Sequence, residues 1–209
     1  MDAAFLITAF VTLFVIVDPI GLTPLFLALT QGMTQAQRRA IGLRACITAA
    51  ILLTLFAGFG EAVLGFVGIS MPAFRIAGGI LLFLTALDML FERRSKRRED
   101  QAGDDDQDHH PDPSIFPLAI PLIAGPGAIA SMILLVGQVQ GLAGFAMVVG
   151  VMLAVLTLLF TLFLIAGFFE RLLGKTGIVV VTRLLGMLLA ALSVQFVLDG
   201  LRAYGLANW

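Results

Sequence analysis

The chain has 209 residues, of which 59% are hydrophobic and only 13% charged, with a formal net charge of −1. Soluble domains carry about a quarter charged residues, so the composition argues against a soluble protein, and nothing in the charge indicates a nucleic-acid partner. The single cysteine, Cys46, excludes an internal disulfide and a CxxC redox pair.

A helix needs about 20 apolar residues to cross a bilayer, and six hydrophobic stretches of the chain reach this length. They cover residues 3–29, 44–66, 71–91, 115–137, 143–169 and 178–200. The first is longer than a signal-peptide core and no A-x-A site follows it, so we expect it to be retained as a span. The long apolar runs lack the alternation of barrel strands. The sequence therefore predicts an all-α, polytopic membrane protein of six transmembrane helices.

Basic residues concentrate in alternate loops, those after the first, third and fifth stretches. They are Arg38, Arg39, Arg44, the run at 93–98, Arg171 and Lys175. Loops rich in Lys and Arg remain in the cytoplasm. Both termini are therefore predicted to face outward, an N-out/C-out arrangement.

Two halves of three spans each are predicted, residues 1–91 and residues 114–209, joined by a cytoplasmic linker at 92–113. The linker begins basic and then turns acidic, with Asp104 to Asp106 followed by His109 and His110. This composition is typical of a solvated linker. Carboxylates and imidazoles are also metal ligands, but their lack of helical spacing favours the linker interpretation, and no metal site is predicted.

Three ordered blocks recur in the two halves. P-x4-P at Pro19–Pro24 matches Pro121–Pro126, and E-x-x-L-G-x-x-G-I at 61–69 matches 170–178. The third block, R-x-x-G, begins at Arg75 and at Arg183. Because each half has an odd number of spans, the second half is predicted to be inverted relative to the first. Inverted repeats of this kind recur in secondary transporters, whose solute site lies near the midplane.

Prolines and glycines interrupt the first and fourth spans at repeat-related places. Proline inside a helix removes a hydrogen bond and clashes with the preceding turn, so half-helices are predicted to begin at Thr23 and at Gly127. Their exposed N–H groups attract anions such as a carboxylate. The alternative is a pair of structural kinks. The candidate solute-binding residues are Asp18, Pro19, Gly21, Thr23, Pro24, Gly125, Pro126, Gly127, Ala128 and Ser131.

Charged residues within spans form the second candidate set. Asp18 lies near the predicted midplane, where a carboxylate is costly unless it is paired or faces water. It is predicted to bind an ammonium group, a coupling cation or a proton, or to cap the following half-helix. Arg75, Arg183 and Asp88 are gating or coupling candidates; the alternative for the arginines is snorkelling to the membrane surface.

Three segments resemble the MarC-type integral membrane proteins, also called the neutral amino acid transporter family. They are V-D-P-I-G-L-T-P at 17–24, A-F-R-I-A-G-G-I-L-L-F at 73–83, and P-L-A-I-P at 117–121 running into G-P-G-A-I at 125–129. The resemblance covers nearly the whole chain, with the Asp-rich linker as the departure. It implies six spans, a multi-pass location in the bacterial inner membrane, and passage of small neutral amino acids such as glycine or alanine.

Other function classes are less consistent with the sequence. A membrane enzyme commonly needs a Ser–His pair or an H-E-x-x-H site, yet both histidines lie in the linker. No catalytic residue and no cofactor is therefore predicted, although a membrane scaffold without transport stays open. The expected partners are a small-molecule substrate, a coupled proton or sodium ion, and the lipid bilayer. Glycine spacings of the GxxxG type also permit a homo-oligomer.

Overall fold

The computed structural model describes residues 3–91 and 112–205, and the predicted linker at 92–113 lies outside them except for its last two residues. Every regular element in the described part is helical. In chain order these are α1 (Ala3–Val17), α2 (Pro19–Leu29), α3 (Gln35–Val67), α4 (Met71–Leu90), the kinked segment η2 (Ser114–Ile123), α6 (Pro126–Val136), α7 (Gly141–Leu164) and α8 (Ala166–Ala203). Within η2 the backbone of Phe116 and Ile120 is extended rather than helical.

The helices follow the predicted spans in chain order, and the predicted number of six is reached if one bent pair counts as a single span. Five segments are long and apolar enough to cross a membrane, the first of them formed by α1 and α2 together, and η2 with α6 adds a sixth if that bent pair is one span. The axes of η2 and α6 differ by 56°. The all-α membrane architecture is thus confirmed for the described residues.

Helix α3 begins well before the apolar stretch that predicted it. Thr34 and Gln37 form a capping box in which the Thr34 hydroxyl accepts from Gln37 N and the Gln37 side chain accepts from Thr34 N. This cap satisfies N–H groups that the helix leaves open. At the other end Gly68 adopts φ 82°, which ends α3 while Ile69 N donates to Leu64 O at 2.9 Å.

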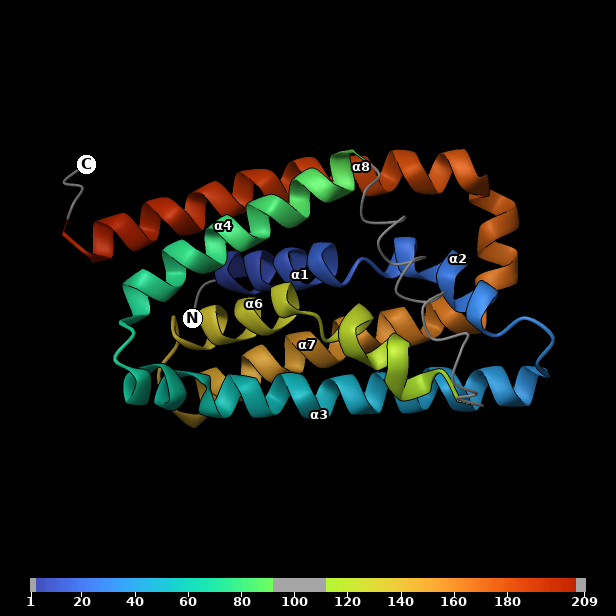
Figure 1. The fold of residues 1–209 in the computed structure, drawn as a ribbon, viewed down its shortest axis with the longest axis horizontal. Coiled ribbons are helices and arrows are strands. Elements are labelled where there is room, and N and C mark those ends of the chain that lie inside the picture. Colours follow the sequence, from blue (N-terminus) through green and yellow to red (C-terminus); the bar gives the residue numbers. More distant parts are fainter. Residues whose placement is uncertain (1–2, 92–111, 206–209) are drawn as a thin grey trace.

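Helix α8 bends at Gly174, whose φ of 63° suits glycine and breaks the helical path. Figure 1 shows the short part before this bend crossing one end of the molecule and the long part returning alongside α4. The two long segments pack closely because glycines lie between them. A Cβ on Gly79 would lie 2.8 Å from Ser193 O, and one on Gly200 would lie 3.1 Å from Pro72 O.

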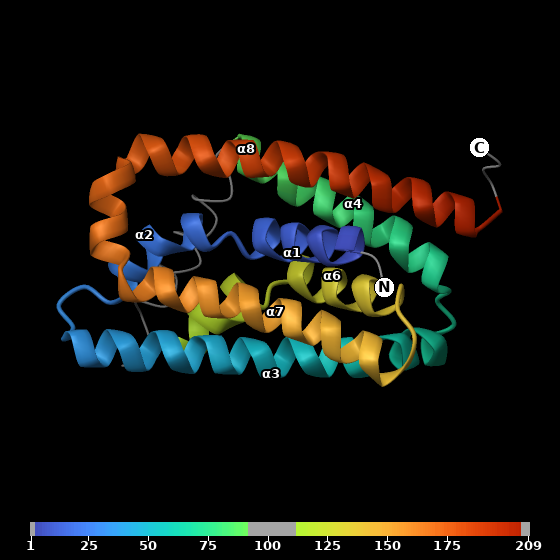
Figure 2. The ribbon, with the colours of Figure 1, turned by 180° about the vertical axis from the view of Figure 1, so that it is seen from behind.

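Figures 1 and 2, from opposite sides, show the same layering. Helices α4 and α8 form one layer, α1, α2 and α6 lie in the middle, and α3 with α7 form the opposite layer. The middle layer contacts both outer layers: α2 packs on α8, and α1 packs on α7. The helices α1, α2 and α6 of the broken spans therefore lie between the two outer layers.

The outer surface is apolar where a soluble protein would be polar. Along α3, Ile47, Ile51, Leu55 and Phe59 are all exposed. Because residues four apart share a helix face, this row forms one continuous apolar face. A surface of this kind suits lipid, since hydrocarbon imposes no cost on exposed apolar side chains.

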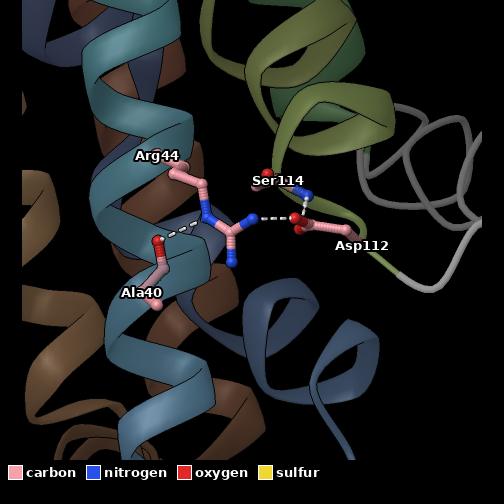
Figure 3. A network of polar contacts seen from close by, with 4 residues as sticks. All are labelled: Ala40, Arg44, Asp112 and Ser114. Carbon is pink, nitrogen blue, oxygen red and sulfur yellow. Dashed lines mark hydrogen bonds and ion pairs between the residues drawn. The ribbon is translucent and has the colours of Figure 1, made fainter.

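A polar contact joins the start of the second half to α3. Arg44 pairs with the Asp112 carboxylate and also donates through Nε to Ala40 O at 3.4 Å. Asp112 in turn accepts from Ser114 N at 3.1 Å, at the beginning of η2 (Figure 3). The pair thus anchors the beginning of the second half against the first.

Candidate functional site

Asp18 forms the break in the first span. It adopts φ 55° and ψ 64°, between the last residue of α1 and the first residue of α2, and it is only 1% exposed. Aspartate is one of the few non-glycine residues that visits this left-handed region. Its carboxylate accepts from Gly21 N at 3.0 Å and so caps α2. The capping role predicted for Asp18 is confirmed.

Helix α2 starts at Pro19, so the prediction that the half-helix begins at Thr23 is wrong. Proline fits the first helical position, where no N–H donor is needed, and Pro24 is accommodated within the helix. Thr23 lies one turn inside, and its hydroxyl donates to Pro19 O at 2.8 Å. Neither Thr23 nor Pro24 lies at an exposed helix start.

Gly21 packs directly against the carboxyl group of Asp18. A Cβ at this position would lie 2.2 Å from Asp18 Oδ2 and 2.8 Å from Asp18 Cγ. Only glycine leaves room for the carboxylate to reach the N–H groups at the start of α2. The carboxyl group of Asp18 therefore occupies the N–H end of α2, the positive end of the helix dipole.

The second break has a different chemistry. Helix α6 begins at Pro126, within one residue of the predicted start at Gly127, and its N-cap is Gly125 with no side-chain cap. Gly127 and Ala128, the next two residues, are buried. Their N–H groups are too early in the helix to reach an intrahelical acceptor. The positive end of α6 is consequently not neutralised by a capping side chain.

The two breaks lie next to each other. A Cβ on Gly127 would lie 3.2 Å from Ile16 Cδ1, and Ile16 lies at the end of α1. Figures 1 and 2 show α1 and α6 side by side and running in opposite directions, with both interruptions near the middle of the molecule. The carbonyl end of α1 and the N–H end of α6 therefore meet in the interior.

Two hydroxyl groups are buried near this meeting point without hydrogen-bond partners, those of Thr12 and Ser131, each in a residue that is 0% exposed. Residues four apart share a helix face, so Thr12 shares the face of Ile16 and Ser131 shares that of Gly127. Because α1 and α6 are antiparallel, one turn back along α1 and one turn forward along α6 lead in the same direction. Thr12 and Ser131 therefore lie at the same level of the helix pair, each one turn from the contact between Ile16 and Gly127.

Several other threonine hydroxyls in the described residues do have partners, although that of Thr182 is also buried without one. The hydroxyls of Thr30, Thr85 and Thr157 each donate to the carbonyl four residues earlier. A buried polar group without a partner costs about 1–3 kcal/mol, and such groups often mark an unseen water, ion or functional site. Thr12 was not among the predicted site residues. Its distance along the sequence from the break at Asp18 does not indicate a site, and only the packing of α6 against α1 reveals one.

The charged gating candidates lie on either side of the breaks rather than at them. Leu82 of α4 is at the level of the breaks, 3.8 Å from a Cβ on Gly127. Arg75 lies about 10 Å to one side along α4, and Asp88 about 9 Å to the other, at 1.5 Å per residue. Arg75 is half-buried, and its Nε is buried without a hydrogen-bond partner.

Arg183 lies on α8 at the Asp88 end of α4. Gly186 follows one turn further along α8, and a Cβ on it would lie 3.0 Å from Met89 Cβ. The antiparallel register of α4 and α8 thus separates Arg75 and Arg183 to opposite ends of the helix pair. The structure therefore gathers most of the predicted site around the two breaks and places the arginines away from it.

Comparison with known proteins identifies relatives over almost the whole chain. The pattern described as "MarC family integral membrane protein" matches residues 3–204. The UPF0056 membrane protein YvbG of Bacillus subtilis is 36% identical over 203 residues, covering 97% of this chain and 96% of that protein. The UPF0056 membrane protein YhcE of Escherichia coli is 35% identical over 202 residues, covering 95% of this chain and 94% of that protein. No solved structure matches the chain.

Proposed function

Because the chain belongs to the MarC family of integral membrane proteins, we propose that it is a secondary transporter of small solutes, with its site at the paired helix breaks. The observation that carries this proposal is the meeting of the α1 carbonyl end with the uncapped α6 N–H end in the interior. Discontinuous helices with such opposed ends form the solute and ion sites of many transporters. The proposal assigns the protein no enzymatic activity.

Small neutral amino acids are the proposed substrate class. A zwitterion has one negative and one positive group a few bonds apart, and the proposed site offers a binding group for each. The α6 N-terminus at Gly127 and Ala128 would receive the carboxylate. The α1 carbonyl end and Asp18 would receive the ammonium group, since a carboxylate can accept several hydrogen bonds and still cap α2. The close packing of Ile16 against Gly127 favours a small side chain.

The carboxylate is assigned to α6 rather than to α2. Asp18 already occupies the N-terminus of α2 through its bond with Gly21 N, and a substrate carboxylate there would face a like charge. Gly125 has no side chain with which to occupy α6 in the same way. The proposal therefore leaves Thr23 and Pro24 out of the carboxylate site.

Alternating access by two inverted repeats, with a proton or sodium ion as the coupling ion, is the proposed mechanism. It is supported by the likeness of the half-helices α2 and α6, which are both 11 residues long and both begin with proline. This likeness pairs Pro19 with Pro126, whereas the sequence blocks had paired Pro19 with Pro121. Rocking of one half against the other would then open the site to each side in turn.

The proposed location is the plasma membrane, the inner membrane of a bacterial cell, with both termini outward. The distribution of Lys and Arg over the predicted loops supports this orientation. The arginines at the two ends of the α4–α8 pair suit gates on opposite sides of the membrane. The exposed apolar rows leave room for association with further copies of the chain.

Flux of radiolabelled glycine and alanine into proteoliposomes, with and without imposed proton or sodium gradients, tests the proposal. Asp18→Asn should abolish gradient-driven flux yet retain the fold, because asparagine is an equally good N-cap. Glu61→Gln is the matched control, since it removes a carboxylate from an exposed position on α3. Absence of flux in folded wild-type protein would refute amino acid transport, and equal flux in wild type and Asp18→Asn would remove Asp18 from the site.

A further inference from the structure

A polar hollow of about 80 Å³ lies at the end of the molecule crossed by the first part of α8, away from the paired breaks. Residues from α2, α3, α7 and α8 line it, including Phe26, Gln35, Arg38, Arg39, Phe163 and Gly167. A cavity needs only about 10–15 Å³ to hold one water molecule. The hollow thus admits a polar group of several non-hydrogen atoms.

The charge lining the hollow is positive and lacks a balancing acid. Arg38 and Arg39 both lie near the start of α3, where the helix dipole adds further positive potential. No aspartate or glutamate is among the described residues that line it. Arg38 Nε donates to Thr30 O at 3.2 Å, which holds the guanidinium in place, and arginine has further N–H donors for an anion.

The hollow also lies where phospholipid headgroups would be. Leu43, 45% exposed, and Ile47 begin the apolar outer row of α3, and Arg38 precedes Leu43 by about 7.5 Å of helix. On the first part of α8, Phe168 and Leu172 are 67% and 71% exposed and share one face. An exposed apolar face on a short transverse helix is typical of a segment lying in the membrane interface.

We propose that the hollow binds the phosphate of an anionic phospholipid. The guanidiniums of Arg38 and Arg39 would donate to the phosphate oxygens, since arginine suits phosphate through paired donors. Leu164, which lines the hollow, and its neighbour Ile165 are both exposed apolar residues. They offer an acyl chain a path from the hollow onto the lipid-facing surface. Basic pockets between transmembrane helices bind phospholipid headgroups in this way. The proposal does not depend on the transport proposal.

Native mass spectrometry of the purified full chain, titrated with dioleoyl phosphatidylglycerol, tests this site. Arg39→Gln, which removes an exposed side chain with no role in the fold contacts described, should weaken the tightest lipid-binding event about tenfold, the usual value of one charge-assisted hydrogen bond. Arg38→Gln should weaken it at least as much. Arg202→Gln is the matched control, because it removes the same charge from an exposed position that does not line the hollow.

Two further arms identify the source of the phosphate. Dioleoyl phosphatidylcholine should bind more weakly than phosphatidylglycerol, and inorganic phosphate should not displace the bound lipid at millimolar concentration. Equal lipid affinity in Arg39→Gln, Arg202→Gln and wild type would overturn the site. If inorganic phosphate displaced the lipid and Arg39→Gln lost phosphate binding, the lipid assignment would be overturned. The hollow would then be a site for a free anion.

Discussion

Gly127 at the start of α6 lies directly against Ile16 near the end of α1, so closely that a Cβ on the glycine would be 3.2 Å from Ile16 Cγ1 and Cδ1. This contact sets the register of the two broken spans. It also brings an α-helix carbonyl end and an α-helix N–H end together between the two outer layers of helices. The proposed transport site depends on this contact.

Replacing Gly127 with leucine should close the proposed site. The larger side chain would push against Ile16 and Leu82, and overpacking of this kind costs typically about 1–3 kcal/mol. We expect loss of amino acid flux together with a lower thermal midpoint. Gly150→Leu is the control, since a Cβ on Gly150 meets nothing within 4 Å. Full flux through Gly127→Leu would show that the solute does not pass this contact.

The unpartnered hydroxyls should matter for function and not for stability. Thr12→Val and Ser131→Ala remove buried hydroxyls that have no partner, so the thermal midpoint should stay unchanged or rise slightly. Flux of glycine should fall in both. Thr85→Val provides the contrast, because its hydroxyl donates to Leu81 O at 2.9 Å and its loss should cost about 1 kcal/mol. Destabilisation by Thr12→Val with unchanged flux would make that hydroxyl structural.

Asp18 and Gly21 should be thermodynamically coupled. Gly21→Ala forces a methyl group onto the Asp18 carboxylate, at 2.2 Å from Oδ2, and should lower the unfolding midpoint strongly. Asp18→Gly removes the carboxylate and keeps the left-handed backbone accessible. In the double variant, Gly21→Ala should therefore cost less than it does alone. Thermal unfolding in detergent measures the cycle, and simple additivity of the two changes would contradict the close contact.

The predicted orientation is open to cysteine labelling. The native Cys46 is buried, with its thiol 3.8 Å from Leu156 O, so it should give little background. Gln31 and Gln140 are exposed and lie in loops on opposite predicted sides of the membrane. In intact cells a membrane-impermeant maleimide should label Gln140→Cys and leave Gln31→Cys unlabelled until the cells are opened. The reverse pattern would invert the orientation.

Much of the architecture follows from the sequence because the bilayer imposes a simple rule. Backbone polar groups must be satisfied within each span, so an apolar run of sufficient length becomes a helix, and α4 and α7 follow their predicted stretches closely. Proline and glycine restrict the backbone locally. For this reason both broken spans were predictable, and the break at Asp18 was placed within the correct motif.

Other features depended on contacts between distant residues. Proline suits both a helix start and a tolerated interior position, so only the folded chain decided that α2 begins at Pro19 and contains Pro24. The place of Thr12 beside the breaks emerges only when α1 lies beside α6. The hollow at Arg38 requires α3, α7 and α8 to meet. Hydrophobicity along the chain determines which segments enter the membrane, whereas the register of packed helices decides which polar groups meet inside it.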